Sequence, residues 1–222
     1  PFCPSRFVHH AGAMLLREPG LLTRLVAAVA AELGEAVPLS VKLRSGFSSS
    51  SELKVLLPAL ARRGVSELIV HCRTRRELYD CARLDWSVLQ GWRARLPQLL
   101  VVANGDIFDA AAARACLVKS GVQVLMCGRG ALMIPNLAQV LIAGARPDGL
   151  PELVSSVLAL WDELLKCGHS AQAALTRAKQ FLGYARRSGA PEVVALFERF
   201  CRLQDPAVGR EMLQMAVYEK PV

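Results

Sequence analysis

The stretch at residues 99–137, LLVVANGDIFDAAAARACLVKSGVQVLMCGRGALMIPNL, contains two apolar runs that each stop at a glycine turn. The first run, residues 99–103, ends at Asn104-Gly105-Asp106, and a helix-like segment follows from near Asp109. The second run, residues 122–127, ends at Gly128-Arg129-Gly130. Short apolar runs bounded by such turns predict two successive β-α units of a parallel sheet.

These two turns also suggest a binding site. In a β/α barrel, the loops after the last two strands and a following helix N-terminus form the usual phosphate site. We therefore expect Gly128 and Arg129 to hold a cofactor phosphate, with residues 104–106 beside them.

The composition describes a globular protein with an excess of positive charge. Apolar residues make up 53% of the 222-residue chain, which favours a packed core over disorder. The net charge of +8 points, weakly, to an anionic partner such as nucleic acid. The seven cysteines include no C-x-x-C pair, so neither a disulfide framework nor a metal site is predicted. With no long apolar run either, we expect a soluble, cytoplasmic protein.

The same strand-helix alternation extends upstream. Residues 37–44 and 68–73 resemble strands, and residues 21–33, 53–63 and 85–96 resemble helices, with a Ser49/Glu52 capping box before the second. This rhythm is typical of a parallel α/β sheet, either barrel or doubly wound. Four units cannot close an eight-stranded barrel. We therefore expect that residues precede Pro1, or that self-association covers the exposed strand edges.

The pattern changes after the linker at residues 144–149. Residues 151–218 resemble three or four helices without a strand signal. Between Glu163 and Glu192 there are several basic residues and no acidic one. Lys179 and Arg186, seven residues apart, share a helical face, which is either a nucleic-acid contact or a solvated surface.

Cationic side chains gather near the predicted strand ends. Lys42 and Arg44 lie two apart on one strand, and His71 and Arg73 do the same on the next. Bringing these groups together is costly without an anion, so we expect a phosphate-bearing cofactor or substrate; salt-bridged strand ends are the alternative.

A cysteine and two aromatic residues each allow more than one role. Cys3 is either a buried thiol or a catalytic group that acts as nucleophile or proton donor. Tyr79 and Trp86, in and after the loop that follows the His71 strand, suit core packing or base stacking.

Six motifs in order resemble the tRNA-dihydrouridine synthases. They are Cys3-Pro4, Gly12-Ala13-Met14-Leu15-Leu16, Val41-Lys42-Leu43-Arg44, His71-Cys72-Arg73-Thr74, Asn104-Gly105-Asp106-Ile107 and Gly128-Arg129-Gly130-Ala131-Leu132. The segments Ile134-Pro135-Asn136-Leu137 and Lys179-Gln180-Phe181-Leu182 look most like the bacterial C-type subfamily, which modifies uridine 16 of the D-loop. Cys72 stands where the family usually has glycine, and Pro1-Phe2 replaces its usual Asn-x-Gly before Cys-Pro.

The resemblance implies an FMN reduced by NADPH, which passes hydride to the uracil double bond, while Cys3 gives the proton as general acid. Flavin contacts are implied for seven residues: Lys42, His71, Asn104, Gly105, Asp106, Gly128 and Arg129. Contacts with tRNA are implied for Arg44, Tyr79, Lys179 and Arg202.

The predicted fold is the C-terminal half of a TIM (β/α)8 barrel followed by an all-α helical bundle domain. We expect residues 1–143 to form the flavin-binding catalytic domain and residues 150–222 a tRNA-binding domain, with no metal and no membrane contact. The alternatives are a non-catalytic RNA-binding remnant without the N-terminal half barrel, and another FMN barrel oxidoreductase acting on a free pyrimidine.

Overall fold

The structure is a computed structural model that describes residues 12–34 and 36–218, so Cys3 lies outside the described residues. The chain divides into two compact units. The first unit contains the described residues up to Ile107 together with Ala111–Cys127. The second contains Phe108–Ala110 and the described residues from Gly128 onward.

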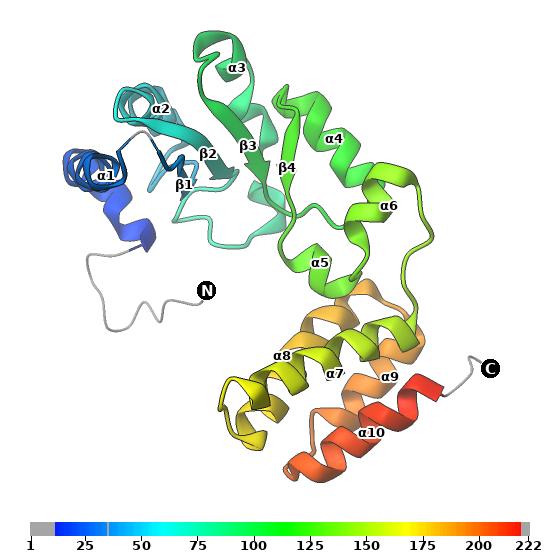
Figure 1. Cartoon of the computed structure of the whole chain (residues 1–222). Helices are drawn as coiled ribbons and strands as arrows, with labels where there is room; N and C mark the ends of the chain where they lie inside the picture. Colours follow the sequence, from blue (N-terminus) through cyan, green and yellow to red (C-terminus); the bar gives the residue numbers. More distant parts are fainter. Residues whose placement is uncertain (1–11, 35, 219–222) are drawn as a thin grey trace. The chain divides into compact units, whose positions relative to one another are not determined.

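Four parallel strands form the sheet of the first unit. They are β1 (Leu39–Arg44), β2 (Val65–His71), β3 (Leu100–Asn104) and β4 (Val124–Met126), hydrogen-bonded in that order. Figure 1 shows them side by side, with α1 beside β1, α2 beside β2 and α4 beside β4. The predicted parallel α/β sheet is confirmed, and it is consistent with part of a β/α barrel.

Helices and short turns connect these strands. Ser49 accepts a hydrogen bond from the Ser51 N–H, and Glu52 accepts one from the Ser49 N–H, so the predicted capping box is confirmed. The single helix predicted over residues 85–96 is wrong. Gly91 adopts a φ of +80° and divides that segment in two. The elements are η1 (Gly12–Arg17), α1 (Pro19–Leu33), η2 (Ser50–Glu52), α2 (Leu53–Ala61), η3 (Cys81–Arg83), η4 (Trp86–Leu89), α3 (Trp92–Arg95) and α4 (Ala110–Ser120).

The core of the first unit lies between the sheet and its helices. Leu68 and Val70 on one face of β2 are fully buried, as are Leu57 and Leu60 of α2. Ile69, on the opposite face of β2, is buried as well. Apolar residues therefore fill both positions of the strand alternation, as expected for a parallel sheet with covered faces. The packed sheet provides a rigid base for the loops at the carboxyl ends of its strands.

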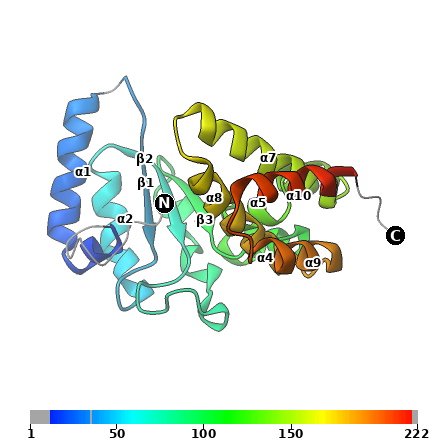
Figure 2. The same cartoon turned by 90° about the horizontal axis from the view of Figure 1, so that it is seen from below.

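The described residues of the second unit form helices and connecting loops, with no strand among them. Trp161, Leu175, Leu182 and Phe200 lie in its apolar core and are buried. Helices α7 and α10 pack side by side in Figures 1 and 2. The elements are α5 (Arg129–Met133), α6 (Leu137–Ala143), α7 (Leu150–Lys166), α8 (Ala171–Ala185), η5 (Arg186–Ser188), α9 (Pro191–Phe200) and α10 (Pro206–Tyr218).

None of the helices in the described part of the chain is long and apolar enough to cross a membrane.

Candidate active site

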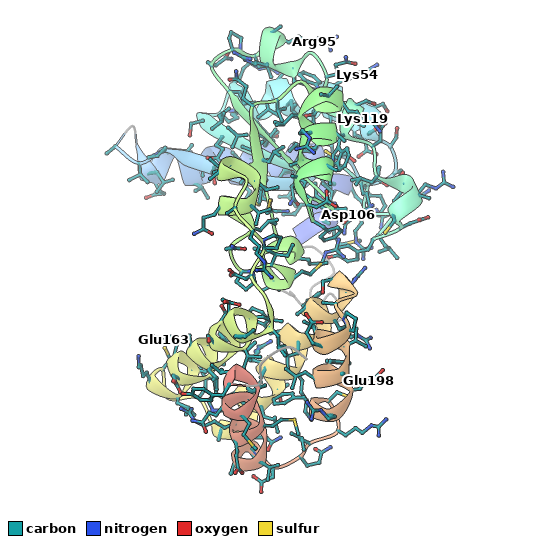
Figure 3. The ribbon with its side chains drawn as sticks, turned by 90° about the vertical axis from the view of Figure 1, so that its right-hand side faces the viewer. Lys54, Arg95, Asp106, Lys119, Glu163 and Glu198 are labelled. Atoms are coloured by element: carbon teal, nitrogen blue, oxygen red, sulfur yellow. The ribbon has the colours of Figure 1, made fainter. Side chains whose placement is uncertain are left out.

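Polar side chains form a row at the carboxyl ends of the strands. Arg44 ends β1 and pairs in register with His71 of β2, which pairs with Asn104 of β3. Asn104 pairs in turn with Met126, the last residue of β4. Figure 3 shows Asp106 at this end of the first unit and Arg95, which precedes β3, at the other. The sheet thus brings three of the predicted site residues together.

Asn104 and the turn after it are held by several hydrogen bonds. The buried Asn104 side chain donates from Nδ2 to the Met126 carbonyl at 2.7 Å, which fixes its orientation. The Asn104 carbonyl accepts from the Cys72 N–H at 2.9 Å. Trp86 donates from Nε1 to the Gly105 carbonyl at 3.0 Å. The predicted cofactor turn therefore has a defined shape.

His71 is a buried neutral base among cations. Burial first, and then the charges of Arg44, Lys42 and Arg73, lower its pKa to about 3. Among the described residues its Nδ1 is buried and has no hydrogen-bond partner. Leaving such an atom unsatisfied costs about 1–3 kcal/mol. A polar ligand at the strand ends would recover that energy.

Lys42 belongs to the same group of cations. The residue is exposed, but burial of part of its side chain and the nearby Arg44 lower its pKa. A positive group whose charge is partly desolvated interacts strongly with an anionic or polar ligand.

Arg44 and Tyr79, the two predicted RNA contacts of the first unit, lie together beside His71. The Arg44 guanidinium is 5.1 Å from the Tyr79 ring centroid. The Tyr79 ring meets His71 edge-on at 6.2 Å and is about half exposed. An exposed aromatic ring with a guanidinium next to it can stack on a base and bind a phosphate.

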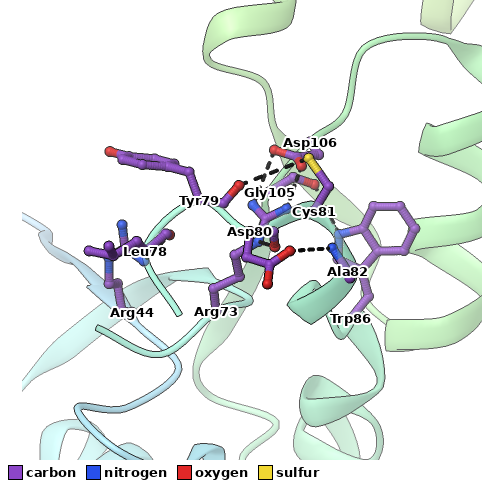
Figure 4. A network of polar contacts seen from close by, with 10 residues as sticks. All are labelled: Arg44, Arg73, Leu78, Tyr79, Asp80, Cys81, Ala82, Trp86, Gly105 and Asp106. Carbon is purple, nitrogen blue, oxygen red and sulfur yellow. Dashed lines mark hydrogen bonds and ion pairs between the residues drawn. The ribbon is translucent and has the colours of Figure 1, made fainter. Parts of the chain in front are cut away.

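Arg73 belongs to the cationic group predicted at the strand ends, and for this residue the salt-bridged alternative is confirmed. It is fully buried and forms an ion pair with Asp106, and its Nε donates to the Asp80 carbonyl at 2.7 Å (Figure 4). The only sequence signal was its position two residues after His71 in the cationic group. Sequence patterns do not reveal which acid will neutralise a given arginine.

The remaining predicted site residues belong to the second unit. Gly128 precedes α5, and the Arg129 guanidinium is 5.8 Å from the Phe108 ring centroid. Lys179 donates from its ammonium group to the Leu203 carbonyl, and Arg202 is exposed. The predicted roles of these residues stay predictions, as does that of Cys3.

No cluster of three or more possible metal ligands is found within residues 12–34 and 36–218.

Comparison with known proteins gives a family match and several similar proteins. A family model described as dihydrouridine synthase matches residues 3–186. The chain is 37% identical over 187 residues to the tRNA-dihydrouridine(16) synthase of Salmonella typhimurium, an alignment covering 83% of this chain and 59% of the relative. The Pasteurella multocida protein of the same name is 35% identical over 201 residues, covering 88% and 62%.

The chain thus spans about 60% of the length of these curated relatives. The family match covers most of the present chain and includes all four strands. On these grounds, this chain belongs to the dihydrouridine synthase family.

Proposed function

We propose that this chain takes part in the flavin-dependent reduction of a D-loop uridine of tRNA, at position 16, to 5,6-dihydrouridine. The names of the curated relatives support the reaction and the position. The observation that carries the proposal is the buried, unpartnered Nδ1 of His71 between Arg44 and Asn104 in the strand-end row. A planar heterocycle with donors and acceptors on its edge is a ligand that suits such a row.

The residues present fit FMN. Neutral His71 offers a donor or an acceptor, Lys42 offers a positive donor, and the Asn104 carboxamide is held in one orientation. We propose that Gly105 and Asp106 complete the ring contacts, and that Gly128 and Arg129 hold the phosphate. Bound FMN, reduced by NADPH, would supply the hydride for the uracil double bond.

The chain's own side chains would place the nucleotide and supply its proton. The target uridine has to leave its stack to be reached, as in other base-modifying enzymes. Arg44 would bind the RNA backbone, and the Tyr79 ring beside it would stack on a base. Cys3 would donate the proton, so its thiol has to stay protonated until the transfer.

We further propose that residues 150–222 form the family's helical tRNA-binding domain. Lys179 bonds to the Leu203 carbonyl and so fixes the segment that carries the exposed Arg202. In this arrangement Arg202 contacts a phosphate of tRNA, and Lys179 adds positive charge beside it.

The test combines the purified chain, FMN, NADPH and an unmodified tRNA transcript, and locates dihydrouridine by mass spectrometry. We expect product at position 16. Cys3→Ala should abolish it while flavin reduction by NADPH continues, and Cys167→Ala, a change at an exposed thiol of the second unit, should leave it unchanged. Continued product formation by the Cys3 variant would remove Cys3 from the mechanism.

Two other results would replace this proposal. A chain that binds no FMN but binds tRNA in a salt-dependent way would be the non-catalytic RNA-binding alternative. A chain that reduces a free pyrimidine and leaves tRNA unmodified would be the other FMN oxidoreductase.

A further inference from the structure

We name residues 74–85, the loop that carries Tyr79, the Tyr79 loop. Two of its carbonyl groups are held by hydrogen bonds from arginine side chains. Arg44 donates from Nη1 to the Leu78 carbonyl at 2.7 Å, and Arg73 donates from Nε to the Asp80 carbonyl, also at 2.7 Å. The anchored carbonyls therefore belong to the residues directly before and after Tyr79. Leu78 has a φ of +52°, a backbone conformation that needs support from its surroundings for such a residue.

The second of these anchors continues into the turn after β3. The Arg73 guanidinium uses both Nη groups on the Asp106 carboxylate, with Nη1 and Oδ1 3.2 Å apart. Asp106 itself has a φ of +46°, so the turn places its carboxylate through a sparsely populated conformation. Figure 4 shows Arg73 between Asp106 and the Asp80 segment.

One planar group thus joins two segments that are far apart in sequence. Arginine presents its five N–H donors in a fixed fork, so its Nε and Nη partners are held in a set relation to each other. Lysine carries a single ammonium group on a flexible stem and cannot reproduce this fork. Because the guanidinium is fully buried, water does not compete for these bonds.

We propose that Arg73 is a positioning residue that couples the Asn104–Asp106 turn to the Tyr79 loop, with Asp106 as its counter-ion. The consequence for RNA rests on the proposed function, in which the turn binds the cofactor and Tyr79 contacts tRNA. The mechanical coupling itself needs neither ligand.

Hydrogen exchange followed by mass spectrometry tests the coupling without any ligand. Arg73→Lys and, as a second variant, Asp106→Asn should each accelerate amide exchange in the Tyr79 loop about tenfold or more, a loss of about 1.4 kcal/mol of local stability. Asparagine tolerates the positive φ of Asp106, so that variant removes the charge and keeps the turn. Unchanged exchange in both variants would overturn the proposal.

Two controls separate this effect from general damage. Arg210→Lys changes an arginine that also pairs with an aspartate, Asp162, but in the second unit and partly exposed. Leu57→Ala removes a fully buried side chain of the first unit outside the network. We expect neither to accelerate the Tyr79 loop selectively; the same selective acceleration in Leu57→Ala would overturn the coupling.

Affinity for an unmodified tRNA transcript tests the consequence. Tyr79→Ala and Arg73→Lys should each weaken binding, and the double variant should bind no more weakly than Tyr79→Ala alone, because Arg73 acts through Tyr79. Fully additive losses would overturn the claim that Arg73 acts on RNA binding through Tyr79. If the wild-type chain binds no tRNA while exchange responds as expected, the coupling stands and the proposed function fails.

Discussion

The two units differ in what they bury. Among the described residues, every buried polar or charged side chain lies in the first unit, and most of these lie at or just beyond the strand ends. The second unit buries only apolar side chains and glycine backbone within its described residues, around Trp161 and Phe200. Nearly all of the net charge of +8 also belongs to the first unit.

The difference shows which unit bears the energetic cost of buried polar groups. Burying His71 and Arg73 costs desolvation energy, which an apolar core avoids. Groups of this kind collect where a protein binds a ligand, because an arrangement suited to a ligand is strained without it. The first unit therefore carries a desolvation cost at its strand ends that the apolar core of the second unit avoids.

The sharpest test compares one ion pair from each unit. Arg73→Met leaves Asp106 without its buried partner and should lower the unfolding free energy of the first unit by about 3–5 kcal/mol. Arg210→Met breaks the partly exposed pair with Asp162 and should cost about 0–1 kcal/mol. The slowest-exchanging amides of each unit report these values. Equal losses would contradict the comparison.

Acidification should weaken the first unit through His71. Its folded-state pKa of about 3 lies below the ordinary value of 6.5, so the unfolded chain binds the extra proton. The unfolding free energy is therefore independent of His71 protonation above pH 6.5. It falls as the pH decreases from 6.5 toward 3, by about 1.4 kcal/mol per pH unit. Urea titrations at several pH values should show this slope. His71→Gln should remove it; an unchanged slope would assign it to other groups.

A methyl group at Gly105 should disturb the turn of the first unit. Gly105 has a φ of +134°, and a Cβ there would lie 2.7 Å from Leu84 Cδ1. Gly105→Ala should cost about 1–3 kcal/mol, mainly from backbone strain at this φ, because the tip of the Leu84 side chain can move aside and keeps the steric part small. Leu84→Ala in the same chain should recover the steric part only. Full recovery, measured by thermal unfolding, would mean that the φ carries no strain.

The smallest expected effect concerns a helix cap in the second unit. Ser170 Oγ accepts a hydrogen bond from the Ala173 N–H at 3.2 Å at the start of α8. Ser170→Ala should cost about 1 kcal/mol and leave exchange in the Tyr79 loop unchanged. Faster exchange in that loop would show that the two units do not respond separately.

Much of the sheet could be predicted because local patterns determine it. Alternating apolar residues and glycine turns located all four strands to within a few residues, and the Ser49/Glu52 pair marked its helix start. The helix predicted over residues 85–96 failed because apolar spacing continues across Gly91, whose positive φ breaks the segment. Periodicity does not register a single left-handed residue.

The site could be predicted only in part. The ends of parallel strands meet at one edge, so the row of Arg44, His71 and Asn104 follows from the strand assignments. The pairing of Arg73 with Asp106 does not, because it depends on how two turns fold back on each other. Nor does a sequence show that His71 Nδ1 lacks a partner, since this is a property of the packed surroundings.

The central claim is that the strand-end row of the first unit binds a flavin. An FMN titration of the purified chain, followed by flavin absorbance and fluorescence, tests it most directly. We expect saturable binding that Lys42→Met and His71→Gln each weaken about tenfold or more, and that Arg202→Met leaves unchanged. An absence of binding, or equal affinity in all four proteins, would contradict the account.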